Sequence, residues 1–111
     1  MESNLYNKFS EIDMRVGKII KVQEFPEAKN PSYKLDIDFS DELGIMKSSA
    51  QITNYKIEDL TGFSCIAVVN LGKKQIGPYI SECLILGSIN QEGKVLLLEP
   101  NSEAKLGDRI Y

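Results

Sequence analysis

The residues that enzymes use for catalysis do not form a recognisable catalytic motif in this sequence of 111 residues. It contains no histidine, which excludes the common histidine-containing zinc sites and the Ser-His and Cys-His nucleophile pairs. Cys65 and Cys83 do not form a Cys-x-x-Cys motif, and each lies within an apolar run. We interpret them as buried, reduced thiols, with a disulfide or redox role as the alternative. The remaining carboxylates and hydroxyls are scattered, so we predict no catalytic site, no metal and no cofactor.

Short polar side chains instead offer groups for binding. Ser48, Ser49, Gln51 and Asn70 carry hydroxyl and amide groups that can exchange hydrogen bonds with the extended backbone of a peptide or a nucleic acid. The alternative is that these groups satisfy the ends and bends of strands. Taken together, the four residues are our candidates for a peptide-binding site.

Aromatic and basic residues could complete such a site. Phe25 and Tyr79 can form the apolar floor of a pocket or a platform on which bases stack, and the alternative is ordinary packing. Lys73 and Lys74 can contact phosphates or an acidic ligand, although two lysines in a turn are usually just solvated. Phe25 and Tyr79 are therefore further candidates for the peptide-binding site. Lys73 and Lys74 are the candidate contacts for a nucleic acid or an acidic ligand.

The balance of charge argues against dominant nucleic-acid binding. The net charge is −3, and acidic and basic residues alternate without forming a basic block. Strong binding to nucleic acid relies on clustered lysine and arginine. No apolar run reaches the roughly 20 residues of a membrane span, and residues 1–10 lack the apolar stretch of a signal peptide. We therefore expect one cytoplasmic domain, spanning residues 1–111, without membrane insertion.

Apolar periodicity in the first half predicts the elements that would position these groups. Leu5, Phe9 and Ile12 share one face of a short helix. Residues 15–25 form a long first strand that ends before a proline, and residues 33–39 alternate as a second strand. A loop at 26–32 separates these two strands, and a turn at 40–44 leads to a third strand at 45–52.

The second half continues the pattern. Asn54 is placed to cap a short helix that ends at Gly62. Residues 65–69 and 83–86 predict strands that are covered on both faces, joined by a loop at 73–79. Residues 94–100 add a further strand. This order predicts an all-β protein, a five-stranded Greek-key OB-fold barrel with short helices and terminal extensions.

Ligands of OB folds bind across strands two and three and the loops beside them. In this chain those parts are the strands at 33–39 and 45–52 and the loops at 25–32 and 73–79. Most of the candidate binding residues fall within them.

Several segments carry a family resemblance. Residues 9–19 resemble the start of the tRNA-binding-domain family. The segment Ser-Ser-Ala-Gln-Ile-Thr at 48–53, together with segments 25–28, 66–71 and 81–87, resembles the CsaA-type export-related chaperones. The resemblance implies an OB fold and a homodimer that binds unfolded or presecretory polypeptides, with the protein-export translocase as a further partner. Structure-specific tRNA binding is the alternative, with tRNA as partner.

The resemblance has consequences for particular residues. Ser81 and Glu82 recur in the family motif, and we expect Glu82 to stabilise its loop by accepting backbone N–H bonds. The loop at 72–79 departs from the family pattern, because lysine stands where arginine is usual and offers no bidentate fork. No glycine-rich phosphate loop is present, so a chaperone role would be ATP-independent.

Apolar residues outside the minimal barrel favour the dimer, because an exposed patch of this kind is rare on soluble monomers. These residues are Leu5, Tyr6, Phe9, Ile110 and Tyr111.

Overall fold

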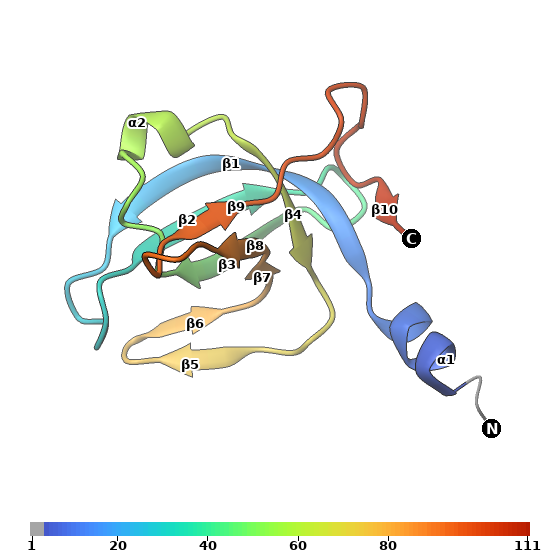
Figure 1. The fold of residues 1–111 in the computed structure, drawn as a ribbon, viewed down its shortest axis with the longest axis horizontal. Coiled ribbons are helices and arrows are strands. Elements are labelled where there is room, and N and C mark those ends of the chain that lie inside the picture. The colour runs from blue at the N-terminus through green and yellow to red at the C-terminus, as the bar shows by residue number, and fades with distance from the viewer. Residues whose placement is uncertain (1–3) are drawn as a thin grey trace.

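The structure is a computed structural model that describes residues 4–111, in which one short helix precedes a succession of strands and a second lies between two of them (Figure 1). The elements are α1 (Asn4–Glu11), β1 (Met14–Glu24), β2 (Tyr33–Asp38), β3 (Ile45–Ala50), α2 (Ile57–Leu60), β4 (Ser64–Val68), β5 (Lys74–Ile76), β6 (Tyr79–Ser81), β7 (Leu84–Ile85), β8 (Gly87–Ile89), β9 (Val95–Leu97) and β10 (Arg109–Ile110).

The long strand β1 organises the main sheet, whose order is β3-β2-β1-β4-β7. The first part of β1 pairs antiparallel with β4, and its second part pairs antiparallel with β2. The register shifts between Ile19 and Lys21, where an irregularity of this kind lets a strand bend from one partner to the next. The start of β1 also pairs with β10 at the end of the chain.

Residues 81–83 close the sheet toward a barrel by joining its two edges. The N–H groups of Glu82 and Cys83 donate to the carbonyl of Lys47 on β3, at 2.7 and 3.2 Å. Ser48 on β3 donates its hydroxyl to the carbonyl of Cys83 at 2.9 Å. These bonds connect β3 with the segment that leads into β7, and the result is the nearly closed antiparallel barrel of the OB fold.

The barrel is filled by the inward side chains of its strands together with Leu60 from α2. Apolar burial of this kind is the main favourable contribution to folding. The core residues are Ile19, Leu35, Ile37, Phe39, Ile52, Leu60, Cys65, Ala67, Cys83, Ile85 and Leu97. The prediction of an all-β OB-fold barrel is confirmed.

Two hairpins extend from the barrel where the sequence predicted less structure. The predicted loop at 73–79 contains β5 and begins β6, which pair across a two-residue turn of Gly77 and Pro78. Gly77 has a φ of 57°, a conformation that glycine adopts without a steric penalty. The strand predicted at 94–100 is the shorter β9, and it pairs with the unpredicted β8.

The prediction for the short helix α2 is correct in its place but wrong in its cap. The cap position is Lys56, which makes no side-chain capping hydrogen bond. Asn54 lies further upstream and donates its side-chain amide to the carbonyl of Val95 at 3.1 Å. Asn54 therefore connects the segment before α2 to the hairpin of β8 and β9.

The predicted N-terminal helix is present as α1, which projects from the barrel at the lower right of Figure 1. None of its residues is buried. Within residues 4–111, no helix is long and apolar enough to cross a membrane.

Candidate ligand-binding site

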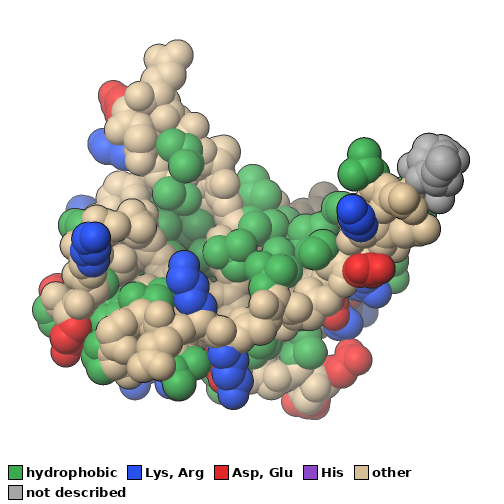
Figure 2. All heavy atoms as spheres, turned by 90° about the horizontal axis from the view of Figure 1, so that it is seen from below, with side chains coloured by type: hydrophobic (Ala, Val, Ile, Leu, Met, Phe, Trp, Pro, Cys, Tyr) green, Lys and Arg blue, Asp and Glu red, His purple; other side chains and the backbone are tan. Residues whose placement is uncertain are grey.

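A hollow of about 610 Å³ lies beside the end of β3, and we call it the β3 hollow. The loop before β2, the hairpin of β5 and β6, and the segment from β7 to β9 surround it. Its lining residues are Ala28, Lys29, Asn30, Ser32, Ser49, Ala50, Gln51, Ile52, Lys74, Gln75, Ile76, Leu84, Ile85, Ile89 and Val95. Seen from the side of β5 and β6, hydrophobic side chains gather across the middle of the molecule (Figure 2).

The lining combines an apolar surface with positive charge. Ile52 and Ile85 are buried beneath it, whereas Leu84 is 48% exposed and Ile89 is 72% exposed. Lys29 and Lys74 are both exposed, and no aspartate or glutamate lines the hollow. A ligand with apolar side chains and some negative charge therefore matches these walls.

The β3 hollow brings together three of the residues predicted as ligand contacts. Ser49, Gln51 and Lys74 all line it. Gln51 is exposed, and the N–H of Ser49 donates to the hydroxyl of Ser81 at 3.3 Å. Gln51 and Lys74 are thus the exposed members of this group, and Ser49 is half-buried.

Phe25 and Tyr79 lie next to each other but do not line the hollow. Their rings meet edge to face with centroids 5.4 Å apart, and the Nζ of Lys34 lies 5.3 Å from the centroid of Phe25 and 5.5 Å from that of Tyr79. Phe25 is only 3% exposed. The rings pack the start of the 25–32 loop against β6, so Phe25 offers no open surface to a ligand.

Ser48 and Ser81 are buried hydrogen-bonding residues. Ser48 is fully buried, and its hydroxyl is occupied by the carbonyl of Cys83. Ser81 donates to the same carbonyl at 3.3 Å and accepts the N–H of Ser49. The placement of Ser48 in a peptide site is therefore corrected, because its side chain closes the barrel and has no contact with solvent.

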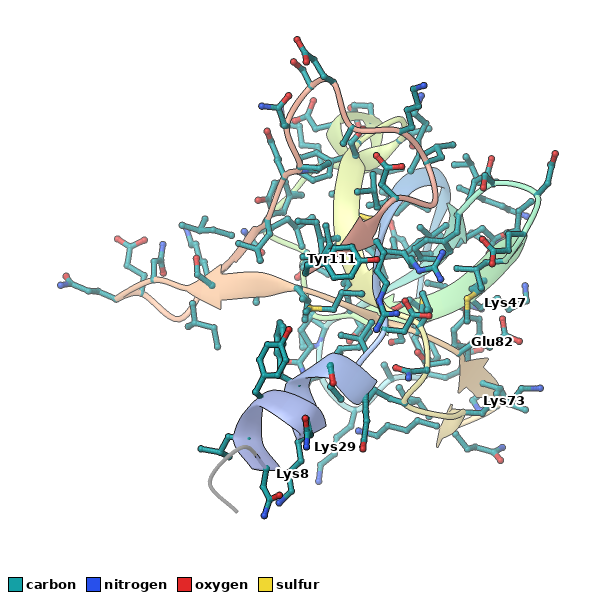
Figure 3. All side chains as sticks on the ribbon, turned by 90° about the vertical axis from the view of Figure 1, so that its right-hand side faces the viewer. Lys8, Lys29, Lys47, Lys73, Glu82 and Tyr111 are labelled. Atoms are coloured by element: carbon teal, nitrogen blue, oxygen red, sulfur yellow. The ribbon has the colours of Figure 1, made fainter. Side chains whose placement is uncertain are left out.

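Glu82 ties the segment before β7 to β3. One carboxylate oxygen of Glu82 accepts the N–H of Lys47 at 2.9 Å, and Lys47 accepts the N–H of Glu82 in return. Lys73 lines a second hollow of about 470 Å³ together with Glu82, and Figure 3 shows the two beside Lys47. Lys73 and Lys74 thus line different hollows and do not form one contact surface.

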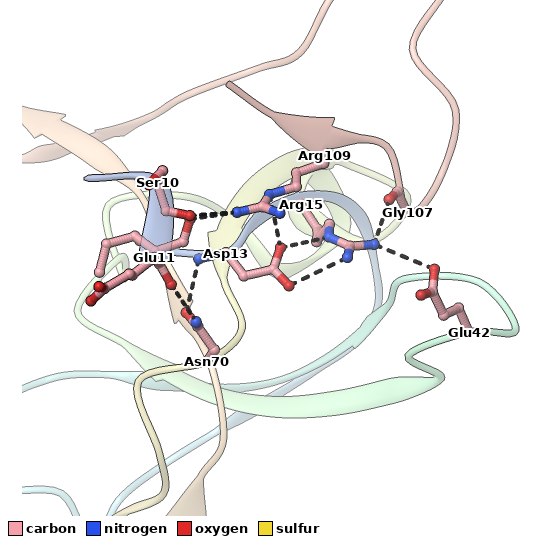
Figure 4. Close-up of polar contacts among 9 residues, drawn as sticks. Ser10, Glu11, Asp13, Arg15, Glu42, Asn70, Gly107 and Arg109 are labelled. Carbon is pink, nitrogen blue, oxygen red and sulfur yellow. Dashed lines mark hydrogen bonds and ion pairs between the residues drawn. The ribbon is translucent and has the colours of Figure 1, made fainter. Parts of the chain in front are cut away.

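Asn70 does not line the β3 hollow but lines the second hollow with Lys73 and Glu82. Its side-chain oxygen accepts the N–H of Asp13 at 2.9 Å, and its nitrogen donates to the carbonyl of Glu11 at 2.8 Å (Figure 4). Both ends of the amide are used to hold the junction of α1 and β1. Asn70 is exposed and lies outside the β3 hollow, so its contact with a peptide stays a prediction.

Several lining residues were not found by reasoning from the sequence. Leu84, Ile89 and Val95 contribute apolar surface, and Lys29 contributes charge. Gly93 has a φ of 81° in the turn between β8 and β9. A glycine among polar residues, between two short apolar segments, was the available signal for this hairpin.

Burial lowers the acidity of three groups near the barrel. It raises the pKa of the Cys65 thiol from 9.0 to about 12, with Cys83 adding a smaller effect. The pKa of Cys83 also rises from 9.0 to about 12, again chiefly through burial. Burial, followed by the nearby carboxylate of Asp36, raises the pKa of Tyr79 from 10.0 to about 12. Both cysteines are unpaired thiols.

Among residues 4–111, no group of three or more histidine, cysteine, aspartate or glutamate residues comes together as metal ligands would. The β3 hollow is lined by aliphatic, hydroxyl, amide and ammonium side chains.

Three comparisons agree on the relatives of this chain. The family described as "Putative tRNA binding domain" matches residues 14–109. The methionine–tRNA ligase of Thermococcus kodakarensis is 34% identical over 110 residues, which is 99% of this chain and 14% of that protein. The chain thus spans about one seventh of the length of this relative.

Solved structures extend the likeness over nearly the whole chain. The CsaA chaperone protein from Picrophilus torridus is 52% identical with a TM-score of 0.91, covering 96% of this chain and 97% of that one. The chaperone CsaA from Bacillus anthracis is 43% identical with a TM-score of 0.89, covering 96% of each. The chain therefore belongs to the tRNA-binding domain family and, within it, resembles the CsaA chaperone proteins.

Proposed function

We propose that this chain is a non-enzymatic holding chaperone whose β3 hollow binds an extended, apolar segment of an unfolded or presecretory polypeptide. The observation that carries the proposal is the lining of the hollow. Its apolar wall includes the exposed side chains of Leu84 and Ile89, and its only charged residues are Lys29 and Lys74. Two neighbours at high structural similarity bear the name chaperone.

The size and chemistry of the hollow suit such a segment. Its volume of about 610 Å³ lies within the roughly 300–1,000 Å³ usual for ligand sites. An unfolded client presents apolar side chains on a backbone that still needs hydrogen-bond partners, and Gln51 offers an amide at the edge of the apolar wall. No nucleotide takes part in this binding, so the chaperone acts without ATP.

The proposal includes a cytoplasmic homodimer, which places two such hollows on one particle. Support comes from the exposed apolar residues near both ends of the chain, including Phe9 at 46% and Tyr111 at 92% exposure. A disordered client loses conformational entropy on binding, so each hollow alone binds weakly. Two hollows raise the effective concentration for the second contact. A protein-export translocase that receives the client would be a further partner.

Binding of structured tRNA is the second candidate function. It is favoured by Lys29 and Lys74 at a hollow without carboxylates, and by the family to which the chain belongs. Phosphate contacts release counterions, so tRNA affinity would fall steeply as salt increases. Affinity for an apolar peptide would depend far less on salt.

Two variants separate these functions. Ile89→Asp places a charge on the apolar wall and should weaken binding of a fluorescent presecretory peptide by at least about tenfold, or about 1.4 kcal/mol. The double variant Lys29→Ala and Lys74→Ala should weaken tRNA binding and flatten its salt dependence. Ile20→Asp is the matched control, because Ile20 is 40% exposed on β1 and does not line the hollow.

The outcome is decided by fluorescence anisotropy and by suppression of aggregation of a heat-denatured client without ATP. We expect Ile89→Asp to lose both activities and Ile20→Asp to keep them. Nanomolar tRNA affinity at physiological salt, lost in the lysine double variant, would instead support tRNA binding. Equal peptide binding by Ile89→Asp and wild type would rule out the β3 hollow as the peptide site.

A further inference from the structure

The N-terminal helix α1 needs support from outside itself. It is 8 residues long, whereas isolated helices shorter than about 12–15 residues are marginal in water. Packing on the barrel does not supply that support, because Leu5 and Tyr6 are 79% and 74% exposed and no residue of α1 is buried. Contacts at the end of the helix must therefore fix its position.

Arg109 binds the C-terminal end of α1 from the other end of the chain. Its Nη2 donates to the carbonyl of Ser10 at 2.9 Å (Figure 4). The same nitrogen lies 3.5 Å from the carbonyl oxygen of Ile12. The last carbonyls of a helix have no partners within the helix. A cation at this end also interacts favourably with the helix dipole. Arg109 thus satisfies groups that α1 cannot satisfy alone.

Asn70 binds the same end of α1 from the segment after β4. It donates to the carbonyl of Glu11 at 2.8 Å and accepts the N–H of Asp13 at 2.9 Å. A single amide therefore spans the junction between helix and strand. This double contact fixes the direction in which the chain leaves the barrel.

A network of charges holds Arg109 in place. The Nε of Arg109 lies 3.8 Å from Oδ1 of Asp13, and the Nε of Arg15 donates to the same oxygen at 2.6 Å. Arg15 also donates to the carbonyl of Gly107 at 3.0 Å. Because β10 pairs with the start of β1, these groups belong to one part of the barrel. The residues that hold α1 are therefore themselves held by the main sheet.

We propose that Asn70 and Arg109 form a clamp on α1 that holds its apolar face in the position where a second copy of this chain docks. Both act as positioning residues, since they bind the backbone of α1 and leave its apolar side chains free. The inference rests on the proposed homodimer and adds the device that orients its contact surface.

A second copy is the occupant because exposed apolar residues from both ends of the chain form one surface, and a two-fold dimer places the same surface of each copy in contact. A groove of about 190 Å³ lies beside α1, and it is lined by Tyr6, Phe9, Ser10, Ile12, Arg109, Ile110 and Tyr111. Figure 3 shows Tyr111 on the same side of the molecule as α1. The apolar side chains Tyr6 and Phe9 of α1 are walls of this groove, so helix and groove form one continuous surface, which a two-fold axis would place against the same surface of the other copy.

The clamp also touches this groove directly. The guanidinium carbon of Arg109 lies 5.6 Å from the centre of the Tyr111 ring. The same side chain therefore contacts the backbone of α1 and one wall of the groove. Loss of Arg109 should disturb both parts of the contact surface at once.

The first test measures the dimer by sedimentation velocity across a micromolar dilution series. Asn70→Ala and Arg109→Ala should each raise the dimer dissociation constant by at least about tenfold, because each removes hydrogen bonds that hold the surface in place. Arg109→Lys keeps the positive charge but lacks the several N–H donors of the guanidinium group. Its dimer dissociation constant should lie between those of the wild type and Arg109→Ala. Gln91→Ala in the turn after β8 and Lys21→Ala on β1 are the matched controls and should leave the constant unchanged.

The second test reads the clamp without the dimer, by hydrogen exchange in a Phe9→Glu background that removes an apolar contact from the groove. In this background, Asn70→Ala should speed hydrogen exchange of the backbone amides of residues 8–12 by about tenfold. The backbone amide of Ile19, which donates to the carbonyl of Phe63 within the barrel, is the internal control and should exchange at an unchanged rate.

The two tests separate the possible failures. A wild-type protein that stays monomeric would overturn the homodimer, and with it docking on a second copy, while faster exchange would still show that Asn70 holds α1. Unchanged exchange in the Phe9→Glu background would overturn the clamp itself. Faster exchange with an unweakened dimer in the Asn70→Ala and Arg109→Ala variants would show that the clamp does not orient the interface.

Discussion

At the scale of single residues, Phe25, Tyr79 and Lys34 form one packed unit beside the β3 hollow. The edge-to-face rings exclude water from the start of the 25–32 loop, and the ammonium of Lys34 lies over both. Aromatic pairs and cation–π contacts each contribute on the order of 1 kcal/mol beyond burial. The unit supports one wall of the hollow by joining that loop to β6.

Phe25→Ala should therefore act on stability more than on affinity. Truncating a buried phenylalanine typically lowers the free energy of unfolding by about 3–5 kcal/mol. Urea denaturation should show this loss, and Phe25→Leu should show a much smaller one. A variant with unchanged stability but weaker peptide binding would mean that Phe25 is a ligand anchor after all.

The three groups with raised pKa make stability sensitive to alkaline pH. In the folded protein Cys65, Cys83 and Tyr79 keep their protons up to about pH 12, whereas their ordinary pKa values are 9.0, 9.0 and 10.0. The folded state therefore binds more protons than the unfolded state in this window. The stability from these groups is complete below pH 9.0 and is lost as the pH rises toward about 12.

Thermal unfolding followed by circular dichroism between neutral pH and pH 11 should show a falling midpoint above about pH 9. The double variant Cys65→Ala and Cys83→Ala is the control, and its midpoint should decline less over the same range. An equal decline in both proteins would show that the buried thiols do not cause the effect.

At the scale of elements, β1 depends on the close approach of other strands at Gly17. A Cβ at this position would lie 2.6 Å from Cε1 of Phe39 and 2.7 Å from Cγ2 of Ile37. Both of these side chains are fully buried, so they have little room to move. Glycine at this position lets β1 cross the core without displacing the second strand.

Gly17→Ala should destabilise the barrel by about 1–3 kcal/mol through overpacking. Chemical denaturation measures this effect, with Lys18→Ala at the neighbouring exposed position as control. Equal stability of the Gly17→Ala variant and wild type would mean that the side chains of Ile37 and Phe39 can move away from β1 at little cost in free energy.

The elements differ in how far the sequence could predict them. The alternation at 33–39 identifies β2 because one face of that strand is buried. The hairpin of β8 and β9 escaped prediction because β8 is exposed throughout and therefore carries no apolar alternation. The roles of Ser48 and Asn70 were also beyond prediction, since their partners lie 35 and 57–59 residues away. Long-range pairing of this kind leaves no local pattern.

At the scale of the whole molecule, a dimer of this chain would carry two shallow binding hollows. A single hollow contacts only a short segment of a client. Two hollows on one particle can hold two segments of the same client, which raises affinity without any new contact. The central claim is therefore that affinity increases with client length, and that this increase requires the dimer.

The most direct test is fluorescence anisotropy with a series of unfolded peptides that carry either one apolar segment or two separated by a flexible spacer. On the wild-type protein, the two-segment peptide should bind on the order of 100-fold more tightly than the one-segment peptide. In the Phe9→Glu variant, which should remain monomeric, the two peptides should bind with affinities within about twofold of each other. An equal gain in both proteins, or no gain in the wild type, would contradict the account.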